Sequence, residues 1–163
     1  MTYLKKATGL LLAALVSMGA QAHTDEYFDT VKGPNGGQVR MAGIYHFELV
    51  LVQDNTTRSK QPVRLYVSDH GDQPKASAGA TAQLVIISGK QKSSVTLTPA
   101  GNNVLAGEAE YVSSADLQAV VQVTMPGEGH GPINAQAKFT PFKSVATTES
   151  DAKPQQHDHS HHH

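Results

Sequence analysis

The alternation of apolar and polar residues in short segments is the feature that most constrains how this chain can fold. In the clearest segment, residues 44–53, the odd positions from Tyr45 to Leu51 are all apolar. Successive side chains of a strand point to opposite faces, so this pattern predicts a strand with one face in a core. The even positions begin polar with His46 and Glu48 and then become apolar. We therefore expect this strand to start near an edge of the core and to finish buried on both faces.

Similar short segments recur along the chain, and turn residues such as Gly, Pro, Asn and Ser separate them. They cover residues 38–41, 63–68, 84–87, 95–98, 105–111, 118–125 and 133–139. Short alternating strands with turns between them are typical of two packed antiparallel sheets. We therefore predict an all-β fold, a single immunoglobulin-like β-sandwich of seven to eight antiparallel strands, in a domain that covers residues 23–143.

The first 22 residues have the pattern of a secretory signal peptide. Lys5 and Lys6 precede the apolar run Leu10–Val16, and small residues lead up to Ala22. The apolar run is shorter than the roughly 20 residues that a membrane-spanning helix needs, and no later segment approaches that length. We expect cleavage after Ala22, export to the periplasm, and no membrane span in the mature chain.

Composition limits the chemistry open to an exported protein of this kind. The chain has no Cys, so the domain depends on its core without disulfides, and a metal site must use His, carboxylate, Met or backbone ligands. The formal net charge of −1 indicates no nucleic-acid partner. The sequence also lacks the common nucleophile, zinc-protease and phosphate-loop motifs, so we do not expect an enzyme.

Residues 144–163 contain almost no apolar side chains and are predicted to be disordered. Five His stand within the last seven residues: His157, His159, His161, His162 and His163. Neutral imidazole suits zinc, copper, nickel and cobalt, so this tail is predicted to be a loose metal buffer. The alternative is a cloning tag, although Asp158 and Ser160 interrupt the run.

Cleavage after Ala22 would place His23 at the amino terminus, with a free α-amine next to its imidazole. That pair can chelate copper(II). The arrangement resembles the amino-terminal copper sites of periplasmic copper-resistance sandwich proteins and of copper-dependent polysaccharide monooxygenases. The alternative is a His that stands at a cleavage site by chance.

Strand direction predicts a third candidate site, at one end of the sandwich. In an antiparallel fold, the start of one strand and the end of the next lie at the same end. This places His46, His70 and His130 together, and Glu48 shares the face of His46 about 6.5 Å along the strand. The four residues predict a copper or zinc site with nitrogen and oxygen ligands. The alternatives are a hydrogen bond shared by His46 and Glu48, and exposed loop His without a ligand.

Three short motifs resemble a known family. The sequences GPNGG at 33–37, GIYHFELVL at 43–51 and LYVSDHGD at 65–72 resemble small periplasmic β-rich proteins encoded beside heavy-metal efflux systems. They are also similar to extensions of the adaptor subunits of those pumps. The resemblance covers about residues 33–140 and implies metal homeostasis in the envelope. Many such sequences have His at the position of Asn35, so this chain lacks one potential ligand in that turn.

Together these features predict a periplasmic protein that binds copper or zinc and buffers it or hands it over. The alternative is an interaction module that binds an efflux adaptor or another envelope protein through a strand edge or loop end. A third hypothesis is an oxidase that uses copper at the amino terminus.

Overall fold

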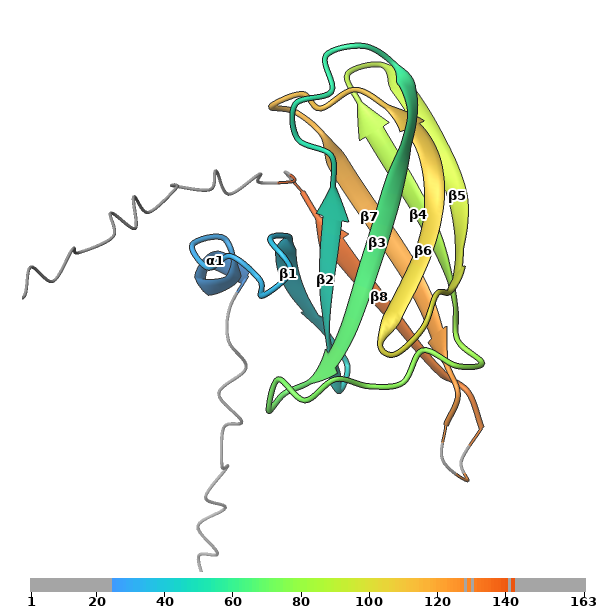
Figure 1. Ribbon diagram of the computed structural model, residues 1–163. Coiled ribbons are helices and arrows are strands. Elements are labelled where there is room, and N and C mark those ends of the chain that lie inside the picture. Colours follow the sequence, from blue (N-terminus) through green and yellow to red (C-terminus); the bar gives the residue numbers. More distant parts are fainter. Residues whose placement is uncertain (1–24, 128, 130, 141, 143–163) are drawn as a thin grey trace, which may run out of the picture.

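The structure is a computed structural model that describes residues 25–127, 129, 131–140 and 142. Within these residues, one short helix precedes eight antiparallel strands (Figure 1). The elements are α1 (Asp25–Phe28), β1 (Gln38–Ala42), β2 (Tyr45–Leu51), β3 (Ser59–Asp69), β4 (Thr81–Ser88), β5 (Gln91–Pro99), β6 (Val104–Tyr111), β7 (Gln118–Met125) and β8 (Ile133–Phe139).

The strands follow the order β1-β2-β3-β6-β5-β4-β7-β8 in one nearly closed sheet. Because β5 pairs mainly with β4, the two layers are β1-β2-β3-β6 and β5-β4-β7-β8, antiparallel sheets of an immunoglobulin-like sandwich. On one side, β5 joins the two sheets, because it pairs with β4 along its length and with β6 only at Thr98 and Pro99. On the other side, Nε of Arg40 in β1 donates to the carbonyl oxygen of Lys138 in β8 at 3.1 Å. The predicted immunoglobulin-like sandwich of antiparallel strands is confirmed.

The core lies between the two sheets and contains the apolar residues of the alternating segments. Its fully buried side chains include Phe47, Leu49, Val63, Leu65, Val67, Leu84, Ile86, Leu97, Leu105, Val121 and Phe139. Each comes from a strand position whose neighbours in sequence face away from the core. The alternation of the sequence therefore accounts directly for the two inner faces.

The expected burial of β2 is wrong in one respect. His46 and Glu48 are 6% and 5% exposed, while Val50, near the end of the strand, is only half-buried. Phe28 at the end of α1 contacts the ring of His46, and the turn at 33–37 contacts Glu48, so these segments cover the first half of the outer face of β2. Periodicity within the strand contains no information about that cover.

Several predictions concern residues outside the described part of the chain. They are the signal peptide at 1–22, His23, His130 and the tail at 144–163 with its five His. In the part that the structure describes, no helix is long and apolar enough to cross a membrane.

Candidate functional site

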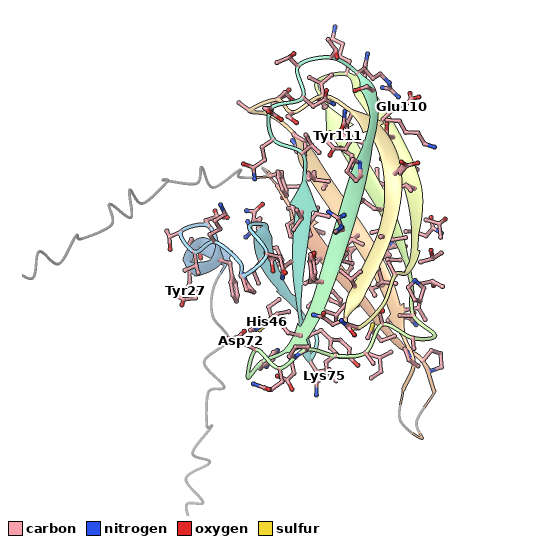
Figure 2. All side chains as sticks on the ribbon, in the orientation of Figure 1. Tyr27, His46, Asp72, Lys75, Glu110 and Tyr111 are labelled. Carbon is pink, nitrogen blue, oxygen red and sulfur yellow. The ribbon has the colours of Figure 1, made fainter. Side chains whose placement is uncertain are left out.

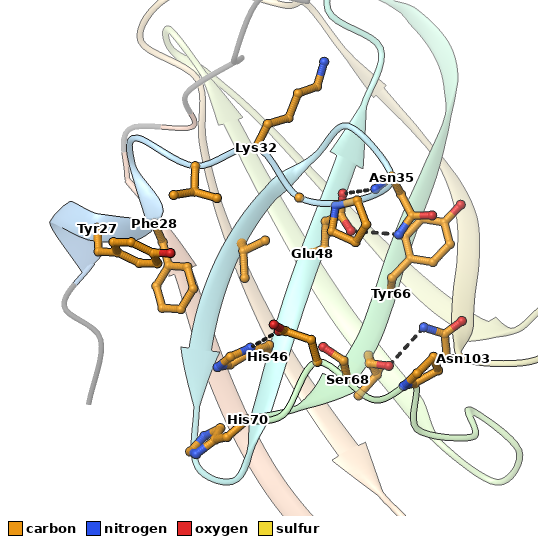
Figure 3. A pocket seen from close by; sticks show the side chains of 17 residues that line it. Tyr27, Phe28, Lys32, Asn35, His46, Glu48, Tyr66, Ser68, His70 and Asn103 are labelled. Atoms are coloured by element: carbon orange, nitrogen blue, oxygen red, sulfur yellow. Dashed lines mark hydrogen bonds and ion pairs between the residues drawn. The ribbon is translucent and has the colours of Figure 1, made fainter. Parts of the chain in front are cut away.

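A pocket of about 700 Å³ lies on the outer face of the first sheet, between α1 with residues 31–35 and strands β2 and β3. Figure 3 shows His46 and Glu48 projecting from β2 into this space, and His70 at its lower end. Figure 2 places His46, Asp72 and Lys75 at one end of the molecule and Tyr111 at the other. The pocket therefore has two differently built parts, one around Glu48 and one around His46.

The carboxylate of Glu48 is fully engaged by the GPNGG turn. Its Oε1 accepts the backbone N–H groups of Asn35 and Gly37, and its Oε2 accepts Nδ2–H of Asn35, each at 2.8 Å. A Cβ at Gly33 would lie 2.3 Å from Cδ of Glu48, so only glycine leaves room for the carboxylate. A buried carboxylate needs such donors to offset its lost hydration. Glu48 therefore holds the turn against the sheet.

Only one of the two ring nitrogens of His46 has a polar contact among the described residues. Nδ1 lies 3.2 Å from Oδ1 of Asp72, and because a carboxylate only accepts hydrogen bonds, Nδ1 carries the ring proton of neutral His46. In that neutral tautomer, Nε2 has the free lone pair of the ring. This atom is buried and has no hydrogen-bond partner among the described residues. A buried polar atom without a partner costs about 1–3 kcal/mol, which is unusual outside a ligand site.

Two aromatic rings contact the imidazole of His46. The ring of His70 stacks on it, with centroids 5.1 Å apart and planes at 27°. The ring of Phe28, at the end of α1, meets it edge-on at 5.3 Å. His70 is exposed, so the pair consists of a buried imidazole on a strand and a solvent-facing imidazole at the start of a loop.

Asp69 fixes the loop that presents His70 and Asp72. Its Oδ1 accepts the N–H groups of Gly71 and Gln73 at 2.9 and 3.0 Å, and its Oδ2 lies 2.8 Å from Nζ of Lys75. The hydrogen bond from Lys75, followed by that from Gln73, lowers the pKa of Asp69 to about 2. Asp72 has a φ of 58°, a left-handed conformation that Asp tolerates better than most residues. The loop therefore returns the carboxylate of Asp72 to His46.

The structure brings two of the predicted site residues together, His46 and His70, and binds Glu48 to the turn instead. Asp72, which contacts His46, is a residue of the candidate site that the sequence did not predict. Its signal was the DHGD sequence, in which a second carboxylate follows His70 through a glycine. Across the described residues, no group of three or more His, Cys, Asp or Glu side chains is placed to hold a metal ion.

Comparisons with protein-family models, with curated proteins and with solved structures found no match. The strand order therefore identifies the fold, and the pocket around His46 is the feature that bears on function.

Proposed function

We propose that this protein is a non-enzymatic periplasmic protein that binds a divalent transition metal, copper or zinc, and buffers it or hands it over. The observation that carries this proposal is Nε2 of His46, a buried imidazole nitrogen without a hydrogen-bond partner among the described residues and next to a second imidazole. Ligand His residues commonly donate their other ring N–H to a carboxylate, which fixes the tautomer and the ring orientation. Asp72 occupies that position relative to His46.

The two imidazoles have different freedom to move toward a common ion. Zinc-bound nitrogens lie about 2.0–2.1 Å from the metal, so the stacked rings of His46 and His70 have to turn before both can bind. His46 sits on β2 between β1 and β3, opposite Met41 and Ser68. His70 lies on an exposed loop and can rotate. His46 is therefore the fixed ligand and His70 the adaptable one.

Sequence features outside the pocket support the same function. The predicted signal peptide favours export, the tail with His157, His159, His161, His162 and His163 supplies further imidazoles, and the three motifs resemble proteins encoded beside heavy-metal efflux systems. In that setting, an efflux adaptor is the expected partner. We propose that the tail binds several metal ions weakly, whereas His46 and His70 belong to a site of higher affinity.

An interaction module is the second candidate, and one observation favours it. Ile44 is 57% exposed in the turn between β1 and β2, next to the strand that contains His46. Tyr27, which lines the pocket, is a second exposed large apolar side chain, at 49%. On this alternative, an envelope protein binds at this end of the sandwich and metal is not needed.

Metal titration of the mature full-length chain tests the proposal. The five tail His are replaced by Ala, and zinc or copper(II) binding is measured with and without His46→Ala and His70→Ala. We expect one retained site, a loss of affinity of at least about tenfold for His46→Ala, and a smaller loss for His70→Ala. Binding should weaken between about pH 7 and 5.5, because unperturbed imidazole has a pKa of about 6.5.

Ser68→Ala is the matched control, because Ser68 pairs with His46 across the sheet and lines the pocket but has no imidazole. It should leave the affinity unchanged. If the chain without tail His binds no metal, or if His46→Ala binds as well as its parent, the proposed site does not exist. Metal-independent binding of the efflux adaptor would then favour the interaction module.

A further inference from the structure

We propose that the thioether of Met41 is a third ligand of the site around His46 and His70, and that it enables this site to bind copper(I) and other soft monovalent ions. This inference rests on the proposed function, because it names a further ligand and a further ion for the same site. Met41 lies on β1, whereas the two imidazoles come from β2 and from the loop that follows β3.

The first argument is the place of Met41 in the sheet. Met41 pairs with His46 across β1 and β2, and residues directly opposite in an antiparallel pair have their side chains on one face, with Cβ atoms about 4.5–5.5 Å apart. Val39, two residues earlier on β1, belongs to the same face and lines the pocket. Met41 is half-buried and has a flexible, unbranched side chain. A thioether and the imidazole of His46 are therefore neighbours on the outer face of the sheet.

The second argument is the chemistry of the donors. Thioether sulfur is a soft ligand that selects copper(I), whereas imidazole suits copper and zinc alike. The chain has no Cys, so Met is its only soft side-chain ligand. Met41, His46 and His70 would form a neutral set of one sulfur and two nitrogens. Copper(I) is stable with three such ligands, whereas zinc is almost always held by four.

The third argument is the environment of the free nitrogen. His46 is 6% exposed and the ring of Phe28 meets it edge-on, so an ion on Nε2 is largely kept from water. A buried ion with one positive charge loses less hydration energy than an ion with two. The carboxylate of Asp72 lies 3.2 Å from the other ring nitrogen, Nδ1, and supplies one balancing negative charge. Limited access of water to the metal also favours the reduced state of copper.

The test is titration of the mature full-length chain, with its five tail His replaced by Ala, with silver(I), copper(I), copper(II) and zinc. Silver(I) has the same ligand preference as copper(I) and is stable in air, whereas copper(I) is supplied without oxygen and measured by competition with a coloured chelator. The parent is compared with Met41→Leu, Met125→Leu and His46→Ala. Leucine keeps the approximate volume of Met without its sulfur. Met125 lies in the core, 2% exposed on β7, so its replacement is the matched control.

We expect Met41→Leu to lower the affinity for copper(I) and silver(I) at least about tenfold, because even the outer-shell partners of metal ligands are worth about 10–100-fold. The zinc affinity should stay unchanged, and Met125→Leu should bind every ion like the parent. In the parent, silver(I) should shift the methyl carbon resonance of Met41 and leave that of Met125 in place. This last measurement does not depend on how well any variant folds.

Copper(I) binding that depends on His46 but not on Met41, with an unshifted Met41 methyl resonance, would overturn this inference and leave the proposed function standing. Equal losses of copper(I) and zinc affinity in Met41→Leu would do the same, because they would show that Met41 supports the fold of the site and does not select the ion. If the parent bound neither zinc nor copper in either oxidation state, both proposals would be overturned.

Discussion

His46 and Glu48 occupy nearly equivalent positions but have opposite hydrogen-bonding environments. They lie two residues apart on the outer face of β2, and they are 6% and 5% exposed. Glu48 accepts three N–H groups, whereas His46 has one ring contact to Asp72 and a buried Nε2 without a partner in the described structure. A buried polar side chain whose hydrogen bonds are all made is typical of a structural role. A buried polar atom without a hydrogen bond needs another explanation, and a binding site is one.

The segments around these residues differ in the same way. The turn at 33–37 packs tightly around Glu48 and the backbone of β2, where two of its glycines leave no room for a Cβ. The loop from Asp69 to Pro74 is held by hydrogen bonds near the surface, with His70 exposed. The turn is packed rigidly against the sheet, and the loop presents the exposed His70, the adjustable ligand of the proposed site. The following changes test that contrast, beginning with the largest expected effect.

Replacing Glu48 by Ala should lower the free energy of unfolding by about 2–4 kcal/mol. The change leaves the buried N–H of Gly37 without its acceptor, which costs about 1–3 kcal/mol. It also removes the partly buried hydrogen bonds from Asn35, whose exposed side chain can turn to water, so they add less. Urea denaturation followed by circular dichroism measures the loss. Glu48→Gln keeps one carbonyl acceptor and should lose less. A change below about 1 kcal/mol for Glu48→Ala would show that the carboxylate does not hold the turn.

Gly37→Ala and Gly71→Ala compare the turn with the loop. A Cβ at Gly37 would lie 2.4 Å from the backbone oxygen of Leu49, whereas at Gly71 the nearest contact is an ordinary 3.4 Å to Oδ1 of Asp69. We expect Gly37→Ala to destabilise the fold by about 1–3 kcal/mol and Gly71→Ala to change stability by no more than about 0.5 kcal/mol. Equal effects in thermal or urea unfolding would remove the distinction.

Replacing His46 by Leu should leave the metal-free protein equally stable or up to about 1 kcal/mol more stable. An apolar side chain of similar size removes the buried unpaired nitrogen, and the lost contact involves Asp72, whose side chain is 86% exposed and contributes little. Unfolding in the presence of a chelator measures this. His70→Leu, at an exposed site, is the control. If His46→Leu lost more than about 2 kcal/mol, His46 would be structural.

Acidification from pH 7 to pH 5 should leave the Asp69 loop intact. The pKa of Asp69 is lowered to about 2, against about 3.9 in an unfolded chain. A depressed pKa contributes stability that is present above about 3.9 and is lost as the pH falls toward 2. Metal release between pH 7 and 5.5 would then come from protonation of imidazoles. Hydrogen exchange at Gly71 and Gln73, corrected for intrinsic rates, should show the same protection at pH 7 and 5, and lost protection by pH 5 would contradict this.

The sequence predicted the fold well because alternation and strand direction are local properties. The odd positions of β2 enter the core as expected, and the antiparallel order places the start of β2 beside the end of β3, so that His46 meets His70. Both results follow from period two and from short connections between antiparallel strands.

Other parts of the site could not be predicted, because they depend on contacts between distant segments. The segment that covers β2 is held by contacts of Asp29 with Arg40 and Gln38. The alternation of residues within β2 does not predict these contacts. The return of Asp72 to His46 depends on a single positive φ. The engagement of Glu48 by backbone N–H groups is likewise invisible in a sequence, because those donors exist at every residue.

Nε2 of His46 is the proposed free ligand atom, and the imidazole nitrogen spectrum tests this assignment most directly. Long-range proton–nitrogen correlation is recorded on the mature full-length chain with its five tail His replaced by Ala, before and after zinc, with His46→Leu for assignment. The account predicts that metal-free His46 carries its proton on Nδ1, and that zinc shifts the Nε2 resonance. A proton on Nε2 in the metal-free protein, or an Nε2 resonance unchanged at saturating zinc, would contradict it.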